Sequence, residues 1–329
     1  MGARCCRFTT TIDYSDHPQF AARATIIHRP KNSSLRDGLA IAAQILGAAR
    51  RGEPLLLTSS WGNIHPDLLA SAIIGLWPQE RRPKIVMMGC MWEPTAGWRG
   101  WIEQRIVRLA DRAIDLYAVQ STEELAVFPK TWRVGLFKTR LCLYFHTFTP
   151  AETTPALEQG HIFAGGNAQR DYEPLLEAAC RLPQQRFIFA TNLLDGRELP
   201  PNVTAGRVSH DRFVELMKTA VINITPIRSG LRRAAGQQTY LNAMLLGKPT
   251  VVTDTLGVHD HLTHRETGLI VDGSTEQYVE AIEWLTDCNN QADVRHLRHA
   301  ARHAAREQFT FENHVDTVLT IVDEALADI

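Results

Sequence analysis

Lysine is the scarcest charged residue in this 329-residue chain, with six copies, and neither sign of charge is in excess. The 35 basic residues, mostly arginine, and the 36 acidic residues leave a formal net charge of −1. A chain without net positive charge has no general attraction for nucleic acid or anionic membranes, so any such contact must be local. We therefore expect no nucleic acid partner.

Cysteine is also sparse and has no diagnostic spacing. The six cysteines show neither CxxC pairs nor a compact framework, which is typical of a reduced cytoplasmic protein without disulfides. Long hydrophobic runs are missing as well: the longest, LLASAIIGLW from Leu68, is about half the length that a bilayer-spanning helix requires. These features predict a cytoplasmic protein that does not cross a membrane.

Motifs for metal-dependent or triad chemistry are missing too. The sequence contains no HExxH motif, no Walker lysine and no Ser-His-Asp order of a hydrolase. The histidine-rich stretch RHLRHAARHAAR, residues 295–306, has no carboxylate or cysteine beside its histidines. We expect no metal site and no bound cofactor.

What the chain does contain is an alternation of helical and apolar segments that begins near Leu39. The pattern runs through PLLLTSS, PKIVMMG and LYAVQS, breaks in the Pro/Thr-rich segment from Phe148 to Gly160, and then resumes with HIFAG, RFIFAT, VINITP, TVVTD and TGLIVD. Such spacing predicts parallel sheets with crossover helices. We expect an α/β protein with two Rossmann-like, doubly wound domains that face each other across a cleft.

The second half of the chain resembles the nucleotide-binding domain of GT-B-fold glycosyltransferases of the retaining family 4. The segments that carry the resemblance are HIFAGGNAQRDYEPLLEA, GRVSHDRFVELMKTAVINITP and GQQTYLNAMLLGKPTVVTDTLGVHDHLTHRETGLIVDGSTEQYVEAIEWL, which cover most of residues 160–285. The resemblance implies an acceptor-side domain in residues 1–150, a nucleotide-sugar domain in residues 151–305, and a C-terminal helix in residues 306–329 that packs back on the first domain. The first forty residues match no pattern of the family.

The segment FAGGNAQRDYEPLLEA predicts a phosphate site. A strand enters the turn formed by Gly165, Gly166 and Asn167, and a helix follows, which exposes backbone N–H groups suited to an anion. Arg170 stands just before that helix, where its planar guanidinium can hold two phosphate oxygens. The resemblance implies that Arg170 neutralises the donor diphosphate, the leaving group of the reaction.

The polar start of the helix in GQQTYLNAMLLG predicts further donor contacts. Gln238 and Asn242 lie four residues apart and share a face, and the helix start from Gln237 to Thr239 is suited to the diphosphate. The resemblance places two glutamates where this chain has Ala234 and Asn242, and implies that Asn242 meets the ribose of the donor. Arg228, in the loop before the helix, is expected to attract the diphosphate or an acidic sugar.

The resemblance also assigns residues to the base and to the acceptor. Thr191 and the segment from Val208 to His210 are expected to frame the base, while Asn63 and His65 are expected to touch the acceptor hydroxyl. The segment from Gly97 to Ala113 combines two tryptophans with four arginines, the composition of an interfacial helix. It therefore predicts peripheral contact with the inner face of a membrane, although Ile106 and Leu109 also fit an ordinary core-facing stripe.

Together these features predict a metal-independent, hexosyltransferase-like enzyme that moves a sugar from a UDP- or GDP-type donor to a glycan or lipid-linked acceptor. The resemblance implies retention of configuration and a role in polysaccharide biosynthesis. The predicted catalytic residues are Arg170, Asn242, Gln238 and His65. The loss of both family glutamates supports an alternative, a catalytically degenerate GT-B-fold protein that binds a nucleotide sugar or glycan as a partner subunit.

Overall fold

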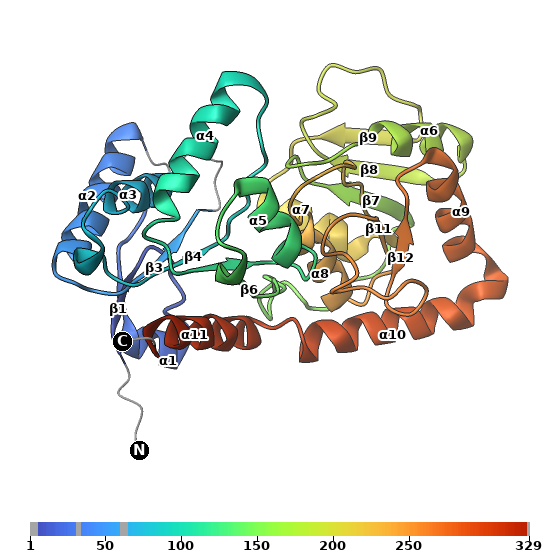
Figure 1. Ribbon diagram of the computed structural model, residues 1–329. Helices are drawn as coiled ribbons and strands as arrows, with labels where there is room; N and C mark the ends of the chain where they lie inside the picture. The colour runs from blue at the N-terminus through green and yellow to red at the C-terminus, as the bar shows by residue number, and fades with distance from the viewer. Residues whose placement is uncertain (1–5, 31–33, 60–64, 328–329) are drawn as a thin grey trace. The chain divides into compact units, whose positions relative to one another are not determined.

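The computed structural model describes residues 6–30, 34–59 and 65–327 (Figure 1). The chain forms two compact units: Met1–Leu143 together with Glu312–Ile329, and Tyr144–Phe311. The divisions therefore fall near residues 143 and 311, where the sequence predicted 150 and 305. Each unit is built on its own sheet and its own core.

The first unit is a parallel six-stranded sheet with the order β2-β1-β3-β4-β5-β6. Chain order reverses between β1 and β3, which makes that point the topological switch of the sheet. The inner strands β1, β3, β4 and β5 are buried, as expected for a parallel sheet covered by helices, whereas the edge strands β2 and β6 are partly exposed. The elements are β1 (Phe8–Thr10), α1 (Pro18–Arg23), β2 (Ala24–Ile26), α2 (Leu35–Arg50), β3 (Leu55–Thr58), α3 (Pro66–Ile74), η1 (Gln79–Arg81), β4 (Ile85–Met88), α4 (Gly97–Ala110), β5 (Leu116–Val119), α5 (Glu124–Trp132), η2 (Leu136–Lys138), β6 (Thr139–Leu141) and the late helix α11 (Phe311–Ala327).

The second unit is a parallel six-stranded sheet with the order β12-β11-β10-β7-β8-β9. Numbered within the unit, this is the 3-2-1-4-5-6 order of dinucleotide-binding folds, with the switch point between β7 and β10. Its elements are β7 (His161–Gly165), α6 (Glu173–Arg181), β8 (Arg186–Ala190), β9 (Val203–Gly206), α7 (His210–Thr219), β10 (Ile222–Thr225), α8 (Gln237–Leu245), β11 (Thr250–Thr253), β12 (Leu269–Val271), α9 (Thr275–Thr286), η3 (Cys288–Asn290) and α10 (Gln291–Glu307).

The alternation predicted from Leu39 onward is confirmed for the strands that the sequence named, and the structure adds β6 and β9, which were not predicted. It also places β1, α1 and β2 within the first forty residues. Strands β1 and β2 have three residues each, too few for a period of two or a buried run to stand out. Within the described ranges no helix is long and apolar enough to span a bilayer.

Helix α11 joins the first unit through polar contacts and a buried histidine. Arg23 of α1 forms a bidentate pair with Asp323, and Arg140 of β6 pairs with Glu324. His314 is buried between two elements: its Nδ1 lies 2.8 Å from the carbonyl of Leu143 and its Nε2 lies 3.1 Å from the hydroxyl of Tyr14. Burial lowers the pKa of His314 from 6.5 to about 4, so the imidazole is neutral in the folded protein at neutral pH.

This histidine predicts a loss of stability in mild acid. Because the pKa is lower in the folded state than in the unfolded state, the stabilising contribution is complete above pH 6.5 and is lost as the pH falls toward 4. We expect the free energy of unfolding, measured by urea titration, to fall by up to about 3 kcal/mol over this window. In His314→Gln the free energy of unfolding should fall less over the same pH window, by up to about 3 kcal/mol, because this variant lacks only His314 while the other buried histidines titrate in both proteins. Equal slopes of the free energy of unfolding against pH in the two proteins would contradict this role of His314.

Candidate donor-binding site

The loop after β7 brings a guanidinium to the switch point of the second sheet. Gly166 has φ of 108° and a Cβ there would lie 3.2 Å from Nη2 of Arg170, so only glycine allows the loop to fold over this side chain. Arg170 donates to the carbonyls of Gly165 (3.3 Å) and Ala168 (3.0 Å). Its backbone forms an isolated bridge with Ile227, which follows β10. The loop therefore spans the two strands between which the chain order reverses.

Arg170 also reaches the first turn of α8. Its Nη2 donates to the hydroxyl of Thr239 at 3.1 Å, and the helix starts at Gly236 without a side-chain cap within the described residues. The first backbone N–H groups of an uncapped helix point outward and favour an anion. The structure thus brings together Gly165, Gly166, Arg170 and Thr239, which the sequence assigned to the diphosphate.

The charge of Arg170 is not neutralised by any carboxylate among the described residues, since all three of its hydrogen-bond acceptors are neutral oxygens. Burial lowers the pKa of its guanidinium, which nevertheless stays cationic because the pKa of an arginine lies far above neutral pH. A half-buried cation without a counter-charge favours the binding of an anion at this place.

Neighbouring side chains hold the same loop in place. Asn167 accepts hydrogen bonds from the hydroxyl of Thr191 (2.7 Å) and the N–H of Asn192 (3.0 Å), which ties the loops after β7 and β8 together. Arg228 binds the side chain and the carbonyl of Gln169, so its guanidinium is held against the loop. Val208 and His210 follow β9 at the same edge of the sheet, where His210 pairs with Glu152 at 2.7 Å.

The polar face of α8 contacts residues 147–148 of the same unit. Oδ1 of Asn242 accepts from the N–H groups of Thr147 (2.8 Å) and Phe148 (3.3 Å), and its Nδ2 donates to the hydroxyl of Thr147. Gln238 donates to that same hydroxyl at 2.9 Å. Asn242 is 3% exposed and both lone pairs of its oxygen are engaged, so a ribose contact requires residues 147–148 to move. The ribose role of Asn242 stays a prediction; Gln237, also buried, begins the helix.

His65 lies in the first unit and is the N-cap of α3. Its Nδ1 lies 2.7 Å from the Asp67 carboxylate and its Nε2 lies 2.6 Å from the guanidinium of Arg29, while Asp67 also pairs with Arg29 and Thr11. This network leaves the buried imidazole no unengaged nitrogen for an acceptor hydroxyl, and its acceptor role stays a prediction. Asn63 lies outside the described residues.

Three contacts of the site were not anticipated from sequence. The hydroxyl of Tyr172 donates to the carbonyl of Gly166 at 2.8 Å, and burial raises the pKa of Tyr172 to about 12, which keeps it a donor. Gln169 holds Arg228, and Thr147 holds Gln238 and Asn242. Thr147 and Asn242 are 95 residues apart, so no local pattern could have connected them. Among the described residues no three His, Cys, Asp or Glu side chains gather as a metal site would require.

Gly236 sets the start of α8 and gives a matched test of the site's architecture. Its φ is 75°, and a Cβ would lie 2.8 Å from Ile227 and 2.9 Å from Thr225. We expect Gly236→Ala to lower the free energy of unfolding by about 2–4 kcal/mol, the sum of backbone strain and overpacking.

Gly196→Ala is the control for this substitution. Gly196 has nearly the same φ, 76°, but no atom lies within 4 Å of the place that a Cβ would occupy, so only the backbone term of about 1 kcal/mol applies. Urea unfolding of both variants separates the two contributions. Equal losses would mean that Ile227 and Thr225 do not constrain the start of α8.

Comparison with known protein families identifies the segment that contains this site. Residues 168–288 match the family described as glycosyl transferases group 1. This range includes Arg170 and all of α8, and it lies where the sequence resemblance was strongest. The predicted resemblance is confirmed. No curated protein sequence matches the chain.

Solved structures share the fold at low sequence identity. A glycosyltransferase from Rickettsia africae gives a TM-score of 0.65 at 13% identity, covering 98% of this chain and 90% of that chain. HepE of Anabaena in complex with UDP gives 0.65 at 15% identity, covering 93% and 86%. Sucrose-phosphate synthase from Thermosynechococcus elongatus gives 0.66 at 13% identity, covering 93% and 84%. The predicted GT-B fold is confirmed.

Proposed function

Because residues 168–288 match the family of glycosyl transferases group 1 and the chain has the GT-B fold, we propose that it transfers a sugar from a nucleoside diphosphate donor to a glycan or lipid-linked acceptor. The observation that carries the proposal is the position of Arg170, a half-buried guanidinium without a counter-charge among the described residues, between a glycine turn and the start of α8. A diphosphate supplies the missing negative charge and is also the group that departs in the reaction.

Other side chains of the second unit complete the donor site in this proposal. Thr239 and the start of α8 meet the diphosphate beside Arg170. Thr191, Val208 and His210, at the carboxyl ends of β8 and β9, frame the base. HepE, solved in complex with UDP and with UDP-glucose, supports uridine diphosphate as the first donor to test.

The transfer proceeds with retention and without a metal ion in this proposal. Arg170 and the helix start stabilise the negative charge that develops on the leaving diphosphate, the task that a metal performs in other transferases. The departing phosphate takes the acceptor proton, so no strong protein base is required. Ala234 and Asn242, which carry no negative charge, are compatible with this route because neither position has to supply a base.

Donor binding should depend on Arg170. We expect UDP or GDP to raise the melting temperature of the protein and to give saturation-transfer NMR signals, and Arg170→Ala to weaken the Kd about 10- to 100-fold, as loss of a charged hydrogen bond does. When the sugar nucleotide of the diphosphate that binds is added instead, the protein should hydrolyse it slowly, at a rate that EDTA does not change.

Arg295→Ala is the matched control, because Arg295 is an exposed arginine on α10 with no partner among the described residues. It should leave both the Kd and the hydrolysis unchanged. Binding without any turnover, with or without acceptor, would favour the degenerate, ligand-binding alternative. No binding of either diphosphate at millimolar concentration would contradict the proposal as a whole.

We propose further that α4 brings the acceptor-side unit to the inner face of a membrane. Trp98, Trp101, Arg105 and Arg108 recur at helical spacing and are all exposed, with the tryptophans 70% and 60% accessible. The guanidinium of Arg105 lies 4.6 Å from the ring centre of Trp101. Glu103, the one carboxylate of α4, is buried and bonds Thr95, so this stripe carries no acidic residue.

The Trp98→Ala/Trp101→Ala variant should therefore bind vesicles more weakly. We expect about a tenfold loss of partitioning onto vesicles that contain phosphatidylglycerol, since two exposed indoles no longer enter the interface. Leu136→Ala/Phe137→Ala is the control, because these residues are also exposed and apolar (63% and 89%) but lie in η2. Co-sedimentation measures both; equal partitioning of the two variants would argue against α4 as the contact.

A further inference from the structure

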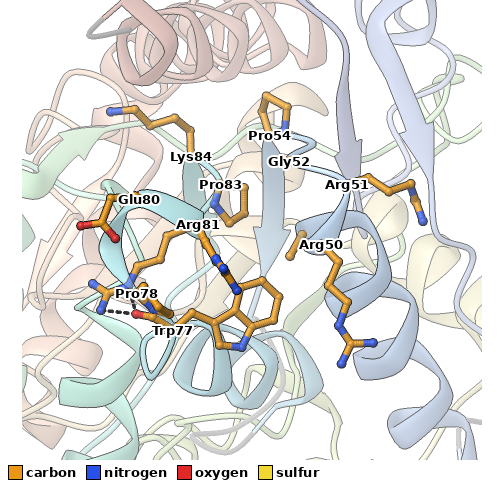
Figure 2. A pocket seen from close by; sticks show the side chains of 12 residues that line it. Arg50, Arg51, Gly52, Pro54, Trp77, Pro78, Glu80, Arg81, Pro83 and Lys84 are labelled. Atoms are coloured by element: carbon orange, nitrogen blue, oxygen red, sulfur yellow. Dashed lines mark hydrogen bonds between the residues drawn. The ribbon is translucent and has the colours of Figure 1, made fainter.

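A cavity of about 850 Å³ lies in the first unit at the edge where β3 and β4 begin (Figure 2). The switch-point residues Thr11 and His65 lie at the opposite, carboxyl edge, so the cavity is separate from the acceptor region assigned above. The end of α2 forms one side, and the segment from the end of α3 through η1 to β4 forms the other. Its lining residues are Ala49, Arg50, Arg51, Gly52, Pro54, Trp77, Pro78, Glu80, Arg81, Arg82, Pro83 and Lys84.

The lining is strongly basic in a chain whose net charge is −1. Five basic side chains, Arg50, Arg51, Arg81, Arg82 and Lys84, face one acidic side chain, Glu80. Like charges gathered around one cavity repel one another, and a bound anion removes that repulsion.

Two of the five basic groups are paired with carboxylates, and a third is held by backbone oxygens. Arg51 binds Glu53 at 2.6 Å and Lys84 binds Asp115 at 3.3 Å. Arg82 donates two hydrogen bonds to the carbonyl of Trp77, at 2.9 and 2.7 Å, and one to the carbonyl of Arg112 at 2.7 Å. These carbonyls fix the guanidinium of Arg82 but leave its charge in place.

The side chains of Arg50 and Arg81 make no hydrogen bond or ion pair with the described residues. They come from different elements, and Figure 2 shows the indole of Trp77 beside the side chain of Arg81, with Arg50 across from it. Arg50 closes the last turn of α2, where a cation also stabilises the helix dipole. That role does not account for Arg81, which lies in η1 and faces the same cavity.

We propose that this cavity binds a phosphate ester, with Arg50 and Arg81 on the phosphate oxygens and the organic part against the indole of Trp77. Guanidinium groups match phosphate in geometry and charge, and an indole offers a flat apolar surface to the attached carbon skeleton. The volume admits an ester and not only an inorganic ion. The same chemistry is presented by a soluble phosphoester and by the headgroup of an anionic phospholipid.

Glycerol 3-phosphate carries the chemistry that both sources share and is the probe for the site. The protein used is full-length Arg170→Ala, in which the donor site no longer competes for phosphate. We expect saturable binding by isothermal titration calorimetry, weakened by 0.5 M salt, and a Kd at least tenfold higher in the additional Arg50→Gln/Arg81→Gln variant.

Arg295→Gln/Arg306→Gln removes the same charge from exposed positions on α10 and should leave the Kd within twofold of its parent. Vesicles of phosphatidylglycerol and of phosphatidylcholine then separate the two sources. Binding of glycerol 3-phosphate with vesicle binding unchanged in Arg50→Gln/Arg81→Gln assigns a soluble ester, because α4 then accounts for the vesicle binding. Loss of phosphatidylglycerol binding in Arg50→Gln/Arg81→Gln relative to Arg295→Gln/Arg306→Gln assigns the headgroup. Absence of glycerol 3-phosphate binding together with equal vesicle binding by both pairs of variants, or an equal Kd for glycerol 3-phosphate in both pairs, overturns the proposal.

Discussion

The hydrogen bond from Arg170 to Thr239 is the contact on which the polar edge of the second unit depends. It joins the loop after β7 to the first turn of α8, which follows β10, and so crosses the switch point of the sheet. Glycine is favoured at 166 because φ is 108° there and a Cβ would crowd the guanidinium, and it is favoured at 236 because φ is 75° and α8 begins against Ile227 and Thr225. Two glycines and one arginine thus fix where a helix N-terminus and a cation meet.

The choice of neutral side chains on α8 follows from what they contact. Asn242 lies where the family pattern has a glutamate, and here its oxygen accepts two backbone N–H groups while its nitrogen donates to a hydroxyl. A carboxylate could accept the same two bonds but could not donate to Thr147, and it would place a buried negative charge in that position. An amide satisfies all three partners without a charge. The substitution is therefore consistent with a structural use of this face, while the positive centre at Arg170 remains unopposed.

The parts of the fold that the sequence revealed are those with long, regular patterns. Apolar segments such as LLLT and IVMM, separated by helical stretches, predicted the parallel sheets from residue 39 onward, except for the edge strands β6 and β9. The strands FTT and ATI escaped detection because three residues carry no usable period, and their pairing is set by β3 and by each other. In the site, the turn at 165–167 and Arg170 were singled out by a local pattern together with the family resemblance, and their role in donor binding stays a prediction. The hydrogen bonds of Asn242 and His65 were not predicted, because their partners are distant in sequence or shared within a buried network.

Charge distribution explains how a nearly neutral chain can present several anion-binding surfaces. The chain has 35 basic residues, of which only six are lysine, and 36 acidic residues. Its net charge therefore attracts distant anions only weakly, and anion binding must depend on local groups of arginine. Many exposed arginines are neutralised in pairs, such as Arg197 with Glu173 and Arg181 with Glu276. The donor loop, the exposed stripe of α4 and the cavity beside η1 are among the places where this pairing is incomplete, and they differ from isolated arginines such as Arg295 in that several groups of the site face one another. A guanidinium binds two oxygens of one anion through directed hydrogen bonds as well as through its charge. Unpaired arginines at a few positions can therefore select among anions, which net charge alone cannot do.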